Sequence, residues 1–232
     1  MTFDIHIATE GTQNAALKQK LVALGFKDDD MAERHVTFDK KTGLFYTSCP
    51  LIGIHMSRKF ATSDCRPVFA VAKQLERLMN TVGAKETGYL HAEREWQDTV
   101  INPASKRFNP QVPFPCGYLK SRPRAKNKKW DIHIAIKKNE LPKSLKDMLM
   151  SHGFYFIVLW KTREGKREQH VIFTIQGVSN AKDGLELFKR MQDWFMAAGG
   201  PRVEMKLEVT NVMKRFNNPM VVPPTVTEVK FR

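Results

Sequence analysis

Cysteine is scarce in this 232-residue chain, which has three: Cys49, Cys65 and Cys116. They are widely spaced and form no CxxC pair, so neither a disulfide framework nor a structural zinc site is indicated. Apolar runs are short as well, and none approaches the roughly 18 residues of a membrane span. The first residues, MTFDIHIATEG, place Asp4 and Glu10 where a secretory signal has positive charge and then a long apolar stretch. We therefore expect a soluble, cytoplasmic protein that does not associate with membranes.

Motifs that indicate common enzyme classes are missing too. The chain has no GxGxxG, no Walker A loop, no GxSxG and no HExxH. These absences exclude the usual sequence signatures of dinucleotide binding, P-loop phosphate binding, serine hydrolysis and zinc peptidases. No cofactor and no metal site is therefore predicted, and both the enzymatic activity and the oligomeric state stay open.

Positive charge, in contrast, is abundant. The chain has 38 Lys and Arg against 24 Asp and Glu, which gives a formal net charge of +14. This balance favours nucleic acid or another polyanion as the partner, because Lys and Arg release the counterions condensed on phosphates. The charge is densest in residues 117–129, GYLKSRPRAKNKK, which include no acidic residue. The predicted phosphate contacts in this segment are Lys120, Arg122, Arg124, Lys126, Lys128 and Lys129.

The sequence contains an internal repeat. The segment DIHIA occurs at residues 4–8 and again at 131–135, and an amphipathic helix ending in Gly-Phe follows each copy. A strand hairpin, a second amphipathic helix and a final strand complete the order β-α-β-β-α-β. The predicted fold is therefore α+β, a tandem duplication of a ferredoxin-like unit with two antiparallel sheets and helices on one face of each. The predicted domains are residues 1–116, a basic linker over 117–129, and residues 130–232, and each repeat ends in a proline-containing tail.

The first repeat carries a segment between Cys49 and Pro67 that the second repeat lacks. We interpret it as a long loop inserted into the scaffold, and such loops often have a functional role. It combines Arg58 and Lys59 with the aromatic ring of Phe60. These three residues are predicted to form a second contact with nucleic acid.

The repeated DIHIA strand is expected to separate an apolar face from a polar one. Because strand side chains alternate, Asp4 and His6 should point away from the isoleucines that face the helices. The same pattern places Asp131 and His133 on the open face of the second sheet.

The final strand of each repeat is expected to lie beside the first and to add polar groups to that face. It contributes His91 and Glu93 in the first repeat, and Lys206 and Glu208 in the second. One interpretation is that these groups satisfy each other's hydrogen bonds between two packed faces. The other is that the two DIHIA histidines line a cleft that binds a phosphate or a metal. Lys206 favours an anion there, because a cation repels a metal ion.

Two short motifs resemble those of known families. His35-Val36-Thr37 resembles the H-x-T element of two-histidine phosphoesterases, and the resemblance implies that His35 and Thr37 act on a phosphodiester. DIHIA followed by Leu-Gly-Phe at 24–26 resembles the modules of vicinal-oxygen-chelate proteins. That resemblance implies metal ligands on the first and last strands, including Glu93 or Glu208.

The tandem ferredoxin-like arrangement, together with the basic charge, resembles RNA-binding and RNA-processing proteins. The predicted function is nucleic-acid binding, with RNA or single strands favoured, through the linker and the inserted loop. Two alternatives stay open. One is a phosphoesterase-like or metal-dependent enzyme in which His6 and His133 act in the cleft between the repeats. The other is a protein-interaction module that binds an acidic partner.

Overall fold

The computed structural model divides the chain into two compact units, each of which is described by itself. Unit 1 comprises Met1–Asp29, Cys49–Trp96 and Thr210–Thr225, and unit 2 comprises Asp30–Ser48, Gln97–Val209 and Val226–Arg232. The structure describes residues 2–10, 14–29, 31–39, 44–47, 52–83, 88–103, 107–115, 129–163, 165–216 and 225–226.

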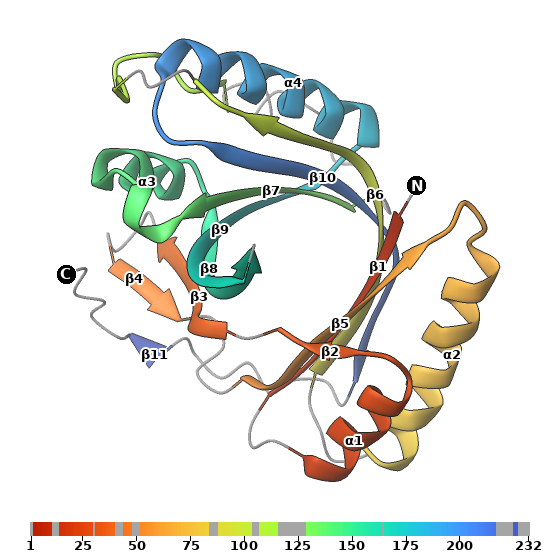
Figure 1. The fold of residues 1–232 in the computed structure, drawn as a ribbon. Helices are drawn as coiled ribbons and strands as arrows, with labels where there is room; N and C mark the ends of the chain where they lie inside the picture. Colours follow the sequence, from red (N-terminus) through yellow and green to blue (C-terminus); the bar gives the residue numbers. More distant parts are fainter. Residues whose placement is uncertain are drawn as a thin grey trace. The chain divides into compact units, whose positions relative to one another are not determined.

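Figure 1 shows the helices and strands of the described residues. The helices are α1 (Ala15–Ala23), α2 (Arg66–Thr81), the short 3-10 helix η2 (Lys138–Glu140), α3 (Lys143–Ser151) and α4 (Ala181–Ala198). The long strands are β1 (Thr2–Glu10), β3 (Met31–Asp39), β5 (Ile52–Ala61), β6 (Gly88–Ile101), β7 (Lys129–Lys137), β8 (Tyr155–Arg163), β9 (Lys166–Val178) and β10 (Val203–Phe216). The short strands are β2 (Lys27–Asp28), β4 (Leu44–Thr47) and β11 (Thr225–Val226).

Local signals fix the ends of the helices. Asn14 precedes α1, and its Oδ1 accepts a hydrogen bond from the backbone N–H of Leu17 at 3.0 Å, which satisfies an amide that the helix itself leaves unpaired. Gly25 and Gly153 follow α1 and α3 with φ angles of 80° and 94°. This left-handed conformation favours glycine and ends the helix, as the two Gly-Phe segments predicted.

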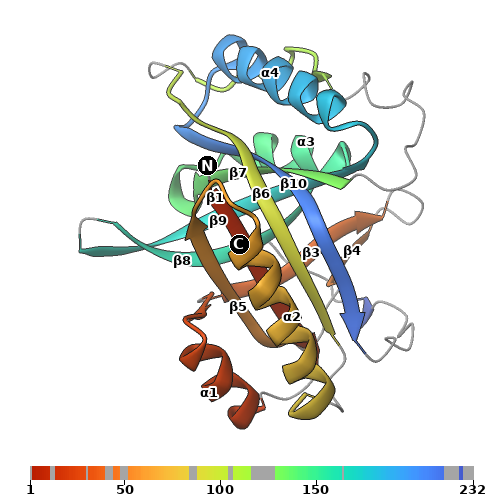
Figure 2. The same cartoon turned by 90° about the vertical axis from the view of Figure 1, so that its right-hand side faces the viewer.

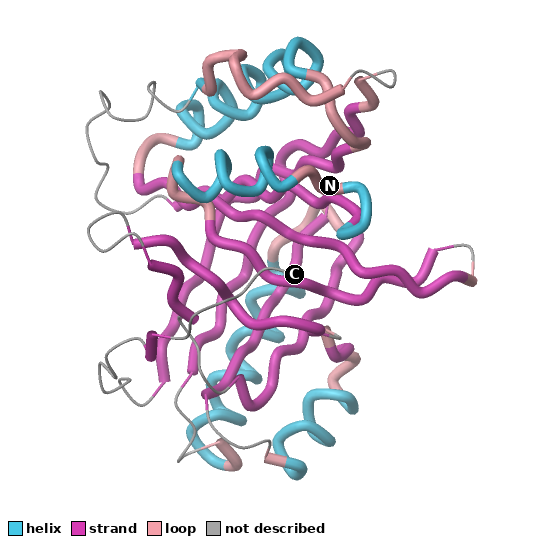
Figure 3. The backbone as a smooth tube through the Cα atoms, turned by 90° about the vertical axis from the view of Figure 1, so that its left-hand side faces the viewer, coloured by secondary structure: helices cyan, strands magenta, loops and turns pink. Residues whose placement is uncertain are grey.

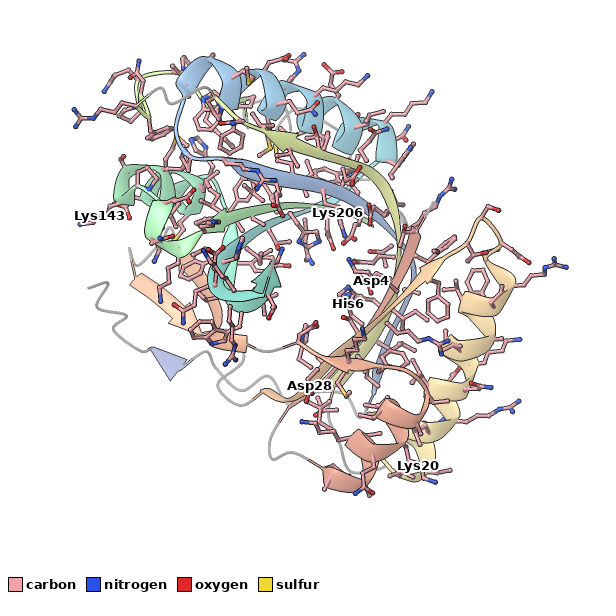
Figure 4. All side chains as sticks on the ribbon, viewed as in Figure 1. Asp4, His6, Lys20, Asp28, Lys143 and Lys206 are labelled. Atoms are coloured by element: carbon pink, nitrogen blue, oxygen red, sulfur yellow. The ribbon has the colours of Figure 1, made fainter. Side chains whose placement is uncertain are left out.

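In unit 1, both helices cover the same face of β1. Ile5 and Ile7 are fully buried in one core with apolar side chains of α1 and α2. Figure 1 shows the two helices on one side of β1 and β5, and the side chains of Asp4 and His6 point to the other side (Figure 4). The alternation predicted for this strand is confirmed.

In unit 2, the buried core includes Trp130 of β7 together with apolar side chains of α3 and α4. Figure 2 shows these two helices. Trp130 is fully buried, and its Nε1 donates a hydrogen bond to Ser179 Oγ at 3.1 Å. The ring leaves no room for side chains on two glycines. A Cβ atom would lie 2.0 Å from the ring at Gly177 and 2.7 Å from it at Gly184.

The strands do not form the two separate sheets that the sequence predicted. Hydrogen bonds join them into one sheet in the order β11-β4-β3-β8-β9-β7-β10-β6-β1-β5-β2. β6 and β10 are neighbours in this order, and each is 14 residues long with residues in both units. The prediction of a tandem ferredoxin-like repeat with two sheets is therefore wrong. A final strand left at a sheet edge exposes unpaired N–H and C=O groups, and β6 and β10 pair these groups with each other instead.

The inserted loop of the sequence analysis is also a strand. β5 pairs antiparallel with β1, with Ala8 opposite His55 and Ile5 opposite Arg58. The hairpin predicted for the first repeat forms β3 and β4 in unit 2, where β3 pairs with β8. β8 itself forms a long two-stranded hairpin with β9 (Figures 2 and 3). β5 therefore supplies the partner that the second edge of β1 needs.

The proline-containing segment 107–115 packs on α4 in unit 2. Phe108 and Phe114 contact the ring of Trp194 edge-on, with centroids 5.9 and 4.9 Å from it. Trp194 Nε1 donates a hydrogen bond to the carbonyl of Val112 at 3.0 Å. The aromatic side chains thus hold this segment against the surface of the helix.

Substitution Gly177→Ala is expected to destabilise the protein, because the new methyl group would overlap the Trp130 ring. Overpacking of this kind costs about 1–3 kcal/mol or more in the free energy of unfolding. Urea denaturation measures the loss. The exposed Lys166→Thr, on the same strand β9, is the control and should change stability by less than about 0.5 kcal/mol. Equal stability of the two variants would contradict the close packing described here.

Candidate functional site

A cluster of imidazoles and carboxylates lies on the face of β1 that the helices of unit 1 do not cover. β1 pairs antiparallel with β6, which sets His6 opposite His91 and Asp4 opposite Glu93. Directly opposed residues of an antiparallel pair have adjacent side chains on the same face. The register therefore brings two histidines and two carboxylates together, and the gathering predicted for the first and last strands is confirmed in unit 1.

The distances in this cluster are short. Glu93 Oε2 lies 3.7 Å from His91 Nε2 and 4.0 Å from His6 Nε2. The rings of His6 and His91 meet edge to face, with centroids 4.9 Å apart. One donor atom from each of these three residues lies within 4.8 Å of the other two. We call His6, His91 and Glu93 the first ligand set.

Glu93 is held in place by the strand β10. The Thr210 hydroxyl donates a hydrogen bond to Glu93 Oε1 at 3.4 Å, so the other carboxylate oxygen is the one that faces the two imidazoles. Glu93 is also buried, with a relative exposure of 2%. A buried carboxylate with one oxygen fixed has little freedom to turn, and outer partners of this kind orient metal ligands.

A second group of residues extends the cluster toward β5. His55 Nδ1 lies 2.8 Å from Asp29 Oδ2, and Ser57 Oγ donates to Asp29 Oδ1 at 3.0 Å. Donor atoms of His6, Asp29 and His55 lie within 4.8 Å of one another. We call these three residues the second ligand set; it shares His6 with the first.

A bulge between β1 and β5 sets the position of His55. The register of the two strands shifts between Ala8 and Glu10. The backbone N–H of Ile54 donates to the side chain of Thr9 at 3.0 Å, so a hydroxyl replaces the backbone acceptor at the bulge. Bulges bend a strand and change the direction of nearby side chains. Here the bulge flanks the residue that adds a third imidazole.

The described cluster in unit 1 has an excess of negative charge. Three carboxylates (Asp4, Asp29 and Glu93) contribute −3 and Lys59 contributes +1, which leaves −2 when the imidazoles are neutral. Lys59 compensates only weakly, because its side chain is 61% exposed and its Nζ lies 3.9 Å from Asp4 Oδ2. Burial raises the pKa of Asp29, but the hydrogen bond and charge of His55, the charge of His6 and the hydrogen bond of Ser57 together bring it below its usual value.

The equivalent residues of unit 2 form a cluster of different composition. His133 Nε2 lies 3.0 Å from Glu208 Oε2, and His133 Nδ1 lies 2.8 Å from Thr174 Oγ1. Lys206 Nζ lies 3.3 Å from Glu208 Oε1. Both nitrogens of this imidazole have partners, and an ammonium stands in the sequence position that His91 has in the first repeat. Asp131, Glu208 and Lys206 leave a charge of −1, which a protonated His133 neutralises.

The pKa of His133 reflects this surrounding charge. Burial opposes the charged ring, but the hydrogen bond and charge of Glu208 and the charge of Asp131 outweigh both burial and the repulsion of Lys206. The pKa of His133 is therefore raised above its usual value. The imidazolium form is favoured, and that form does not bind a metal ion.

The other predicted site residues lie in several places. Arg58 donates from Nη1 to the carbonyl of Leu24 and stacks its guanidinium on Phe60, 4.5 Å from the ring centroid, whereas Lys59 lies beside Asp4. The three are thus on a strand, not in a loop. His35 and Thr37 are on β3, and their side chains fall outside the described residues. The same applies to Lys129, which begins β7; Lys120, Arg122, Arg124, Lys126 and Lys128 also lie outside the described part of the chain.

Sequence reasoning missed His55, Asp29 and Thr210 as members of the cluster. A signal for His55 exists, because Ile54 and Met56 are buried and alternate with His55 and Ser57, as in a half-buried strand. Asp29 and Thr210 have no such signal. Both join the cluster through strand neighbours that lie far away in the sequence.

No family model, curated protein or solved structure matches this chain. The resemblances to two-histidine phosphoesterases, vicinal-oxygen-chelate proteins and RNA-processing proteins therefore stay predictions from short motifs and architecture. Within the described residues, no helix is long and apolar enough to cross a membrane. The function proposed below therefore rests on the geometry of the site.

The stability that His133 contributes should depend on pH. A histidine whose pKa is raised on folding adds stability that is complete below its unfolded pKa, about 6.5, and is lost as pH rises through the folded pKa. We expect His133→Gln to cost about 1–3 kcal/mol at pH 5.5, where a charged hydrogen-bonded pair is lost. The cost should be smaller at pH 8.5. Urea unfolding of both proteins at the two pH values measures it, and a cost that rises with pH would contradict the assignment.

Proposed function

We propose that this protein is a divalent-metal-dependent hydrolase that acts on a phosphate-bearing substrate. The observation that carries the proposal is the first ligand set, in which His6, His91 and Glu93 gather on one face of two paired strands. Imidazole nitrogens and a carboxylate oxygen are ligands of catalytic zinc and of related transition metals. Three protein ligands leave a coordination position for water or substrate.

The spacing of the three donors is close to what an ion requires. With bonds of about 2.1 Å, two ligands of a tetrahedral zinc ion are roughly 3.4 Å apart. The distances of 3.7 Å and 4.0 Å from Glu93 Oε2 to the two imidazoles exceed this value by a few tenths of an ångström. The third separation, between the two imidazole donors, lies within 4.8 Å, so a bound ion would draw the three side chains closer together.

The charges favour a metal in unit 1 over unit 2. A divalent ion neutralises the −2 charge of the cluster in unit 1. In unit 2, Lys206 and a protonated His133 already balance Glu208 and Asp131, and a metal would have to displace them. The ammonium of Lys206, in the sequence position of His91, thus disfavours a metal ion beside Glu208.

The charge of the whole chain indicates the class of substrate. A net charge of +14 attracts anions over distances beyond direct contact. A metal ion in an open site can polarise a phosphoryl oxygen and lower the pKa of a bound water, so that hydroxide is available at neutral pH. A phosphoester fits both properties, and this extends the phosphoesterase alternative of the sequence analysis to a metal-dependent one.

Zinc binding tests the centre directly. Replacing His6 by Asn should weaken zinc binding by at least about 100-fold, because loss of an outer partner alone already costs about 10- to 100-fold. Isothermal titration of metal-stripped protein with Zn²⁺ measures the affinity. His152→Asn is the matched control, since that imidazole stacks on Phe114 in unit 2. Equal zinc affinity in wild type and His6→Asn would contradict the proposal.

Hydrolysis of bis(p-nitrophenyl) phosphate tests the reaction class. Wild-type protein loaded with Zn²⁺ or Mn²⁺ should release p-nitrophenol, the metal-stripped protein should not, and re-addition of the ion should restore the rate. His91→Asn should lose this activity while His152→Asn keeps it. Tight metal binding without hydrolysis in any metal form would rule out the hydrolase and leave a metal-binding protein.

Nucleic-acid binding through residues 117–129 stays a prediction of the sequence, because that segment falls almost entirely outside the described residues. If the segment does contact phosphates, it would hold a polyanionic substrate rather than take part in the chemistry. The basic residues of this segment and the metal centre of unit 1 would then have separate roles, and charge neutralisation of the segment would leave zinc affinity unchanged.

A further inference from the structure

Lys59 lies at the side of the proposed metal centre, on the open face of unit 1. The register of β1 and β5 sets it directly opposite Asp4, so the two side chains leave the sheet on the same face. The ammonium is only loosely held there, because the side chain is 61% exposed and its Nζ lies 3.9 Å from Asp4 Oδ2. A cation in such a position keeps most of its hydration and its freedom to rotate. It can therefore move toward an anionic ligand.

The ammonium is also close enough to the first ligand set to share a substrate with it. Asp4 Oδ2, the oxygen that faces Lys59, lies 3.6 Å from His6 Nε2. Lys59 Nζ is therefore no farther from His6 Nε2 than the sum of these two distances. A lysine side chain carries its charge on a flexible four-carbon stem, so rotations about its bonds bring the charge to several positions above the sheet. One phosphate group could thus contact the ion with one oxygen and Lys59 with another.

The carboxylates of the cluster limit the negative charge that a substrate can carry. Asp4, Asp29 and Glu93 lie around the imidazoles of this face, and each repels an anion. A phosphodiester has two non-bridging oxygens that share one negative charge, so the ion and Lys59 suffice to bind both. A phosphomonoester has a third such oxygen and a charge of about −1.5 to −2 at neutral pH. The additional charge would face the carboxylates.

We propose that the substrate is a phosphodiester, and that Lys59 binds one of its non-bridging oxygens while the ion at the first ligand set binds the other. The inference rests on the proposed function and deepens it by naming the substrate class. Lysine is a frequent phosphate ligand that acts as a point charge. In the reaction, water adds to phosphorus as one P–O bond breaks, and the products are a phosphomonoester, an alcohol and a proton. The monoester is more negative than the diester, so the carboxylates favour its release.

The substrate preference of the wild-type protein tests the class. Protein loaded with Zn²⁺ is assayed with bis(p-nitrophenyl) phosphate, a diester, and with p-nitrophenyl phosphate, the corresponding monoester. We expect kcat/KM to be at least about 10-fold higher for the diester, because like charges brought together at a binding site are strongly unfavourable. A smaller ratio, or a preference for the monoester, would overturn the inference and leave the hydrolase in place.

Three variants test Lys59 itself. Lys59→Met removes the charge and should raise KM for the diester by about 10-fold, the factor that one hydrogen bond to a charged group contributes, with kcat little changed. Lys59→Arg keeps a cation and should return KM to near the wild-type value. Lys73→Met, at an exposed position of α2 on the other side of β1 (Figure 1), is the matched control and should leave KM unchanged. Zinc affinity of Lys59→Met should be no weaker than that of wild type, because an ammonium repels the ion.

The outcomes separate this inference from the proposed function. An unchanged KM in Lys59→Met, with zinc still bound, would overturn the inference while the hydrolase stands. Zinc binding without hydrolysis of either ester would overturn the hydrolase and the inference with it. The substrate preference of the wild type decides the class even if Lys59→Met fails to fold.

Discussion

The register of β1 against its two neighbours is the constraint on which the site depends. β1 pairs with β6 on one edge and with β5 on the other, so each of its polar residues has a fixed neighbour on either side. Burial of Ile5 and Ile7 fixes this register, because a shift by one residue would turn the isoleucines to the open face and His6 into the core. The apolar core therefore decides which imidazoles and carboxylates meet.

The buried carboxylates on the open face require positively charged groups near them. Glu93 and Glu208 are exposed by only 2% and 3%, and an ionised group in such a place needs a counter-charge. Unit 2 meets the demand with the ammonium of Lys206 and the raised pKa of His133. In unit 1 the carboxylates face several imidazoles, which can either take up a proton or bind a metal ion. Buried negative charge is thus balanced by an ammonium and an imidazolium in unit 2, and can be balanced by protonated or metal-bound imidazoles in unit 1.

Local patterns in the sequence predicted the helices, the helix ends and the polar face of β1, because periodicity and Gly-Phe segments act over a few residues. The repeat also predicted the pairing of β1 with β6, but the other long-range pairings were missed. β5 was interpreted as a loop because the second repeat lacks an equivalent segment, and the pairing of the hairpin strand β3 with β8 was not foreseen. Each of β6 and β10 could form the edge of a separate sheet or pair with a further strand. The residues within these strands give no signal that distinguishes the two arrangements. Asp29 and Thr210 entered the cluster through the same long-range pairings.

The net charge of the chain and the charge of the cluster around His6 have opposite signs, and for the proposed hydrolase this difference would set the order of binding. The net charge of +14 draws an anion toward the protein, but its field is screened over about 8 Å at physiological ionic strength. Close to His6 the anion meets three carboxylates, and a charge of −2 repels it. An ion bound there removes the repulsion at short range, where screening is weakest. Under the proposed function, metal binding would therefore have to precede the binding of a phosphate-bearing substrate, and the same carboxylates would repel that substrate in the absence of the ion.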